Sequence, residues 1–241
     1  MSEEERKEAF LADFKELENA LLSIAKIKEE GHVSFSRALN TIYYSRLHPL
    51  LSDYENYDFL KTAADLRNIL SHENDVCIPT EEYLKKFHAL KEEIVHPLDC
   101  YDVATKKIQT CYENDTLLSV TKRMAYASLS HLPIVDSQNH VLGIFSRSTV
   151  FDYLSLNESF VYTPETKISA FSEVTGIHDH LNETFFFVGR YEKVYKVYSY
   201  LKQKAHEKNL GLLLVSEHGK ENERLLGVIS LTDLMKGNAE E

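Results

Sequence analysis

The C-terminal half of the chain contains one sequence pattern twice, and this pattern decides the fold. The first copy reads HLPIVD at 131–136 followed by VLGIFS at 141–146, and the second reads LLLVS at 212–216 followed by LLGVIS at 225–230. Each pair of apolar, β-rich runs separated by a polar stretch predicts two strands joined by a turn. A recurring unit of this kind predicts two similar modules that pack against each other, with a cleft between them that suits a small ligand.

The residues around these runs extend each copy into a βαββα unit. The first copy, about 97–155, is expected to add a strand at 108–111 and helices at 117–128 and 149–154. The second copy, about 165–238, is expected to contain strands at 185–188, 211–216 and 224–229 and helices at 194–206 and 231–235. A further strand or short helix is expected around 167–171, in the linker.

The N-terminal part of the chain predicts helices instead. Apolar residues recur at three- and four-residue spacing within 9–24, 38–47, 60–70 and 83–94. Ser34 and Thr80 are expected to cap the second and fourth helices, Gly31 to end the first, and Pro49 to end the second after Leu47. The third helix is expected at 58–71. Four helices with short connections predict a small antiparallel bundle.

The bundle is expected to end at His96, because the residue before Pro97 is pushed out of helical geometry. The predicted fold class is therefore α+β. A four-helix bundle at 1–96 is followed by a tandem pair of βαββα modules at 97–241.

The composition excludes several classes of protein. Of 241 residues, 43% are hydrophobic, which is enough for two modest globular domains, and the formal net charge of −11 argues against nonspecific binding to nucleic acids or membrane surfaces. The charged start of the chain has no apolar run behind it, and no stretch has the apolar length of a membrane span. Three cysteines without metal-ligand spacing favour free thiols in a reducing compartment. We expect a cytoplasmic protein with no metal site and no membrane partner.

The repeated segments resemble the CBS domain, and the two copies together resemble a CBS pair, or Bateman module, over about 97–238. The resemblance implies an adenosyl ligand in the cleft, with a carboxylate on both ribose hydroxyls and a hydroxyl and helix amides on phosphate. It implies a ribose and phosphate side formed by Ser230, Thr232 and Asp233. It implies an adenine side formed by Gln109, Thr110, Ser130, His131 and Pro133.

The first copy departs from the family pattern. It keeps Ser146, but Thr149 stands where the ribose-binding aspartate belongs, and a hydroxyl binds a diol more weakly than a carboxylate does. We therefore expect one good nucleotide site and one degenerate or empty site. For Ser230 and Asp233 the alternative is helix capping, because Ser-x-x-Asp is also a capping pattern. AMP, ADP, ATP, S-adenosylmethionine and cyclic di-AMP share the part of the ligand that Asp233 would bind.

A second resemblance lies at the end of the third predicted helix. Arg67, Asn68 and His72 resemble the motif of the HEPN superfamily, whose active members are metal-independent ribonucleases. The resemblance implies that His72 acts as general acid or base and that Arg67 stabilises the charged phosphorane. The same residues fit a non-catalytic HEPN-like bundle that binds a partner, or an unrelated bundle. Acidic residues outnumber basic ones in 1–96, which is unfavourable for binding RNA.

These expectations combine into a cytoplasmic sensor. Its CBS pair is expected to bind an adenine nucleotide and to couple this binding to the helical domain, and we do not expect an enzyme. A homodimer is expected, as pairs of this family commonly form, with tyrosines of 191–200 at the interface. The alternatives are a nucleotide-regulated, metal-independent HEPN endoribonuclease that binds RNA, and a dimeric adaptor whose cleft is empty.

Overall fold

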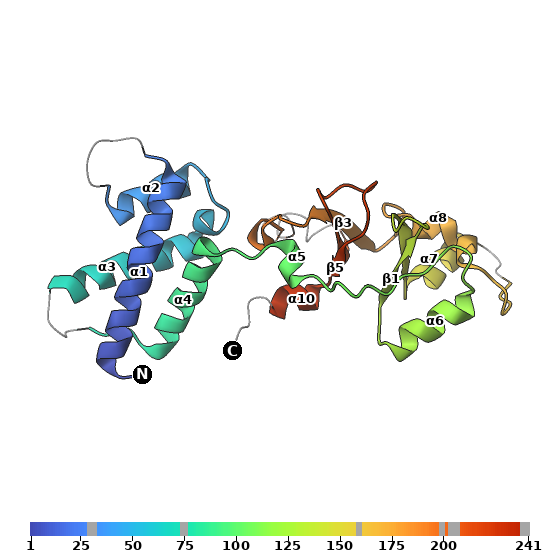
Figure 1. The fold of residues 1–241 in the computed structure, drawn as a ribbon, viewed down its shortest axis with the longest axis horizontal. Helices are drawn as coiled ribbons and strands as arrows, with labels where there is room; N and C mark the ends of the chain where they lie inside the picture. The colour runs from blue at the N-terminus through green and yellow to red at the C-terminus, as the bar shows by residue number, and fades with distance from the viewer. Residues whose placement is uncertain (28–32, 73–76, 158–160, 198–200, 202–207, 237–241) are drawn as a thin grey trace. The chain divides into compact units, whose positions relative to one another are not determined.

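A computed structural model describes the chain except for residues 28–32, 73–76, 158–160, 198–200, 202–207 and 237–241. The chain divides into two compact units, Met1–Leu98 and Asp99–Glu241. The described part of the first unit is helical, and all the described strands belong to the second (Figure 1). The fold class is α+β, with a helical N-terminal region, as the sequence predicts.

The first unit consists, within its described residues, of α-helices joined by short connections and one 3-10 helix. The elements are α1 (Glu3–Ala25), α2 (Phe35–Tyr44), η1 (Leu50–Ser52), α3 (Tyr54–His72) and α4 (Glu81–Val95). The two predicted N-caps are confirmed, since the side chains of Ser34 and Thr80 accept hydrogen bonds from backbone N–H groups at 3.3 and 3.2 Å. Helix α1 packs against both α2 and α4.

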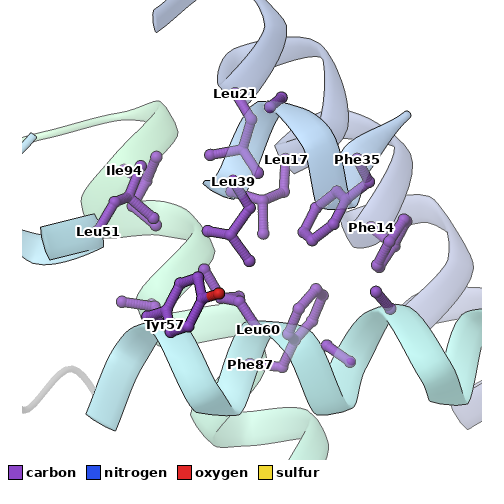
Figure 2. Close-up of a cluster of buried hydrophobic side chains, with 14 of the residues drawn as sticks. Phe14, Leu17, Leu21, Phe35, Leu39, Leu51, Tyr57, Leu60, Phe87 and Ile94 are labelled. Carbon is purple, nitrogen blue, oxygen red and sulfur yellow. The ribbon is translucent and has the colours of Figure 1, made fainter. Parts of the chain in front are cut away.

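Aromatic side chains form much of the core of this unit. Phe10 and Phe87 are fully buried, with ring centroids 4.8 Å apart, and Phe14 stacks on Phe35 at 4.4 Å. Figure 2 shows side chains from all four helices converging on this core. Since an amphipathic helix is stabilised mainly by burying its apolar face, these contacts hold the helices together.

Helix α1 ends at Ala25, followed by Lys26 in a left-handed conformation (φ 50°), and Gly31, which was expected to end this helix, lies outside the described residues. Two further helix boundaries in this unit differ from the prediction. Helix α2 ends at Tyr44 and not at Leu47, because Arg46 adopts a left-handed conformation (φ 50°) and the N–H of Leu47 bonds back to Ile42 at 3.1 Å. Pro49 precedes η1 and does not end a helix. Helix α3 begins at Tyr54, earlier than predicted, because the Asp53 carboxylate accepts the N–H of Glu55 at 3.1 Å.

The second unit contains the repeated modules. The first copy comprises α5 (Cys100–Val103), α6 (Leu117–Tyr126), β1 (His131–Val135), β2 (Val141–Ser146) and α7 (Thr149–Leu156). The linker forms η2 (Ile168–Phe171) and α8 (Ser172–Thr175). The second copy comprises β3 (Glu183–Gly189), β4 (Asn209–Ser216), β5 (Gly227–Ile229) and α10 (Leu231–Lys236). Most of the helix predicted at 194–206, with Tyr198 and Tyr200, lies outside the described residues.

The strand pairing repeats in the two copies. Strands β1 and β2 are antiparallel, with Ile134 opposite Gly143, and β4 and β5 are antiparallel, with Val215 opposite Gly227. Strand β3 runs parallel to β4 on its other side, and Cys111 makes the corresponding parallel bridge to β1. The sequence repeat therefore corresponds to a repeat in structure.

The strand predicted at 108–111 is not formed. Only Cys111 pairs with β1, whereas Thr105 pairs with Val228 of β5 through two backbone hydrogen bonds of 2.9 and 3.1 Å. Residues 106–110 therefore cross from the sheet of the second copy to the sheet of the first. A segment that crosses between sheets cannot pair continuously with either of them.

Smaller differences concern helix ends and one short element. Helix α6 is capped by Thr116 and ends at Tyr126, because Ser128 has a left-handed conformation (φ 54°). Asp115, which directly precedes the capping residue, accepts hydrogen bonds from the N–H of Tyr112 and from Arg123. Strand β5 begins at Gly227, later than the predicted 224, and α5 was not predicted at all.

A hydrophobic cluster joins the two copies. Val135, Val141 and Ile144 of the first copy pack in one cluster with residues of the second, namely Phe185, Leu212, Leu214 and Leu225. Polar contacts add to this interface, because Asn139 exchanges hydrogen bonds of 2.9 Å with the backbone N–H and C=O of Leu225. The two copies therefore share a core, as the repeat predicts.

Candidate functional site

The turn between β2 and α7 in the first copy is lined by hydroxyl groups. The N–H of Ser146 donates to the hydroxyl of Thr149 at 2.8 Å, and the hydroxyls of Ser146 and Ser148 are 2.8 Å apart. Ser146 and Thr149 are buried. The Thr149 hydroxyl thus accepts a backbone N–H of the turn, as the Asp233 carboxylate does at the equivalent place in the second copy.

A carboxylate from the second copy lies against this turn. Glu183, the first residue of β3, accepts the hydroxyl of Ser148 at 2.9 Å and lies 2.8 Å from Nε2 of His131. His131 stands opposite Ser146 in the β1–β2 register, and its Nδ1 is 2.8 Å from the hydroxyl of Ser130. The hydroxyl of Ser130 can donate to Nδ1, which leaves Nε2–H to donate to the carboxylate. The first-copy turn therefore already holds an anion supplied by the chain itself.

The surroundings fix the charge of Glu183. Burial alone would raise the pKa of its carboxyl, but hydrogen bonds from His131 and from the serine hydroxyls outweigh burial and lower the pKa to about 2. His180 is fully buried, and its Nδ1 is 3.9 Å from the Glu183 carboxylate. Burial lowers the pKa of His180, so this ring is neutral at pH 7.

Two buried polar groups near Glu183 lack hydrogen bonds. Neither ring nitrogen of His180, nor Oδ2 of the buried Asp152 on α7, has a hydrogen-bond partner among the described residues. The Thr175 carbonyl affects the pKa of His180, but it lies outside hydrogen-bond geometry. Buried polar atoms without partners are rare in folded proteins and are typical of sites that bind something. None of Ser148, Asp152, His180 or Glu183 was singled out from the sequence.

Acid is expected to weaken this cluster. The pKa of Glu183 is lower in the folded protein (about 2) than its ordinary value (4.5), so the ionised carboxylate stabilises the fold above pH 4.5 and this contribution disappears as the pH falls toward 2. Glu183→Gln should remove about 2 kcal/mol at neutral pH and flatten the pH dependence in this window. Hydrogen exchange of β1 and β3 peptides between pH 2 and 7 would measure it, with the exposed Glu165→Gln as control. Parallel profiles for wild type and Glu183→Gln would contradict the assignment.

The equivalent turn of the second copy is arranged differently. Oδ2 of Asp233 accepts the N–H of Ser230 at 2.8 Å and its hydroxyl at 2.6 Å, which is the capping arrangement. Its other oxygen makes no hydrogen bond to the described residues, and the side chain is half-exposed. Thr232 is exposed. Capping and ligand binding are therefore compatible, because only one carboxylate oxygen is used by the cap.

The residues expected on the adenine side fall into two groups. Gln109 is exposed and Thr110 half-buried, and both lie on the segment that crosses between the sheets. Ser130 directly precedes β1, and His131 and Pro133 belong to this strand, where the carbonyl of Pro133 accepts the N–H of Cys111. Among the described residues, no hydrogen bond joins these side chains to Ser230 or Asp233.

The HEPN-like residues lie on the last turns of α3. Arg67 extends over the ring of Phe14, 5.8 Å from its centroid, and lies 3.4 Å from the side-chain oxygen of the exposed Asn68. The side chain of His72 is outside the described residues. Arg67 thus contacts an aromatic ring of the core, and within the described part of the chain it forms no ion pair with an acid.

One group in the helical unit has the spacing of metal ligands. Glu16, Glu92 and His96 place ligand atoms within 4.8 Å of one another. The ammonium group of the buried Lys91 contacts both carboxylates, 2.9 Å from Glu16 and closer still to Glu92, and lies 3.1 Å from Asp13. These carboxylates already face a cation, so the cluster is an ion-pair network between α1 and α4.

The cysteines have no redox or metal partner in the described part of the chain. All three are free thiols, and burial raises the pKa of Cys100 and Cys111 to about 12. Such thiols stay protonated and unreactive. They contribute to the core only.

Comparison with known proteins finds a family for one part of the second unit. Residues 100–156 match the family model of the CBS domain. A search of the curated proteins finds no match to the chain.

Solved structures with CBS domains resemble this unit. A Vibrio cholerae protein assigned to acetoin utilization (AcuB) is 24% identical, with 58% of this chain and 89% of that chain covered, at a TM-score of 0.42. The CBS pair of protein MJ0100, in complex with 5′-methylthioadenosine and S-adenosyl-L-methionine, is 17% identical over 58% and 94%, at 0.43. The CBS domains of a transcriptional regulator from Streptococcus pneumoniae are 18% identical over 58% and 98%, at 0.40. Among the described helices, none combines the length and apolar character that crossing a bilayer requires.

Proposed function

We propose that the second unit is a regulatory sensor that binds one adenine nucleotide at the β5–α10 turn. The observation that carries the proposal is the difference between the two turns. The Asp233 carboxylate is half-exposed and has one oxygen without a partner among the described residues, whereas the first-copy turn is filled by Glu183. Of the two turns, only the second has a carboxylate available to a ligand.

The chemistry of the turn suits a nucleoside phosphate. The free oxygen of Asp233 accepts hydrogen bonds from ribose hydroxyls, and the hydroxyls of Ser230 and Thr232 donate to phosphate. The adenine ring lies against the crossing segment at Gln109 and Thr110, with Ser130, His131 and Pro133 further along the first copy. AMP, ADP or ATP fits this description, and S-adenosylmethionine and cyclic di-AMP share the ribose.

A buried cluster and a short connection link the proposed ligand-binding turn to the helical unit along the chain. Ile229 and Leu234, which flank the ligand-binding turn, pack in one buried cluster with Cys100 of α5. Residues 96–99 connect α5 to the end of α4. A ligand that alters the β5–α10 turn can therefore bias the helical unit, to the extent that it binds two arrangements with different affinity.

The protein is further proposed to act as a homodimer. Phe151 and Leu154 of α7 are exposed in the single chain, and Phe151 is 77% exposed. Large apolar side chains exposed on one helix are typical of surfaces that another protein covers. A second copy of the chain is the partner proposed here.

Asp233→Ala should abolish the response to nucleotide. Thermal melting of wild type with AMP, ADP, ATP, S-adenosylmethionine and cyclic di-AMP is expected to show stabilisation by one of them, about 2.7 kcal/mol at a hundredfold excess over Kd. Asp233→Ala removes the ribose contacts and should lose this shift. Asp233→Asn keeps a side-chain oxygen that accepts from Ser230 but removes the negative charge. Comparing the two variants therefore separates the effect of losing the helix cap from the effect of losing the charge.

An exposed carboxylate provides the control for this experiment. Glu165→Ala should leave the ligand response unchanged, because Glu165 is exposed and lies away from the turn in sequence. A response that survives in both Asp233 variants would refute the site. No response to any of the five ligands in wild type would favour the dimeric adaptor.

A further inference from the structure

We infer that Glu183 acts as an internal ligand: the second copy inserts this carboxylate into an anion-binding site of the first copy and so closes that site to phosphate. Removing the carboxylate is expected to expose a second anion site. The inference rests on the proposed nucleotide site in one respect: together they explain why the pair of modules binds one ligand and not two. The anion site itself is formed by other residues than the nucleotide site.

The groups that hold Glu183 are those that would hold a phosphate. One carboxylate oxygen lies 2.8 Å from Nε2 of His131, and the other accepts the Ser148 hydroxyl at 2.9 Å. Imidazole N–H and hydroxyl groups donate to carboxylate and to phosphate oxygens alike. With an exposed fraction of 19%, the Glu183 side chain is largely removed from water, so it fills the site and does not merely lie across its opening.

These donors are not needed for the turn itself. The N–H of Ser146 is already satisfied by Thr149, at 2.8 Å. In the second copy Asp233 caps the turn, and the partners of Ser230 are all within the turn. The side chains of His131 and Ser148 therefore make no cap hydrogen bond, and beside their contacts with Ser130 and Ser146 both hydrogen-bond to Glu183.

The charges around the site indicate why an anion is held there. His180, fully buried, faces the Glu183 carboxylate at 3.9 Å, and neither ring nitrogen has a hydrogen-bond partner among the described residues. His131 and Asp152 also interact electrostatically with His180. Loss of Glu183 removes one negative charge and leaves the imidazole rings of His131 and His180 and the Ser148 hydroxyl without the carboxylate they face. Hydrogen-bond donors that have lost their acceptor favour an incoming anion.

Rescue by inorganic phosphate tests this inference on the full chain. Glu183→Ala is expected to melt at a lower temperature than wild type, and phosphate is expected to raise its melting temperature by several degrees more than it raises that of wild type. Sodium chloride at the same ionic strength controls for screening. Glu183→Gln fills the site with a neutral side chain and should gain no phosphate response. Should the alanine variant not fold, Glu183→Ser takes its place in the same titration.

Titration calorimetry with AMP separates this inference from the proposed function. Wild type is expected to bind one AMP per chain, Asp233→Ala none, Glu183→Ala two, and the double variant one. AMP binding by Glu183→Ala but not by wild type would support the internal ligand and reject the Asp233 site. An equal phosphate response in wild type and in the folded Glu183→Ala or Glu183→Ser variant would overturn the inference, whatever the Asp233 site does.

Discussion

Phe87→Ala is expected to lower the free energy of unfolding of the helical unit by about 3–5 kcal/mol. Phe87 is fully buried, and its ring lies 4.8 Å from Phe10 and 6.3 Å from Phe14, so truncation removes contacts with α1 that no neighbour can replace. Urea unfolding followed by circular dichroism measures the loss. Lys85→Ala, at an exposed position of the same helix, should change little.

The same variant also tests whether the units are independent. Each unit has its own buried core, so hydrogen exchange should increase in peptides of α1 and α4 and stay unchanged in those of β1 and β4. Faster exchange throughout the chain would contradict the presence of separate cores.

Gly143→Val is expected to destabilise the second unit by about 3 kcal/mol or more, at the upper end of what overpacking costs. A Cβ at Gly143 would overlap the carbonyl oxygen of Thr175 and lie 2.9 Å from its carbonyl carbon. These are backbone atoms, which cannot rotate away as a side chain can. Strand β2 would have to separate from α8, and the hydroxyl-lined turn that follows β2 would move with it.

Thermal melting of this variant gives the measurement. Gly189→Ala is the control, because a Cβ there would meet its nearest atom at 3.4 Å, an ordinary contact. If Gly143→Val melted like Gly189→Ala, the close approach of β2 to α8 would be refuted.

Local patterns predicted the elements whose causes are local. The N-caps Ser34 and Thr80 bond to N–H groups three residues away, so the capping residue and the first turn appear together in the sequence. The apolar runs of β1 and β2 and the repeated Leu-Gly-Ile/Val segment likewise lie within a short stretch of sequence. Close approach also explains the repeated glycine, since a Cβ at Gly227 would lie 2.8 Å from Ala104.

The rest could not be predicted because its causes are distant in the chain. Glu183 meets Ser148 and His131, which are 35 and 52 residues away, so no local pattern marks it as part of a turn in the other copy. The expectation of a degenerate first-copy site rested on Thr149, but the carboxylate that fills the site comes from elsewhere. The sequence at 108–111 is typical of a strand, but the pairing of Thr105 with Val228 keeps residues 106–110 from pairing with β1.

The pairing of Thr105 with Val228 has a consequence for how the two copies can be separated. Helix α5 completes the core of the second copy, although it precedes the first copy in the chain. A cut placed after α7 would leave the second copy without Cys100 and Ala104, and the first fragment with exposed apolar surface. Gene fusions built from this protein should therefore transfer residues 99–236 as one unit. The segment that follows α5 pairs first with the second copy and then with the first, so neither copy can be excised without it.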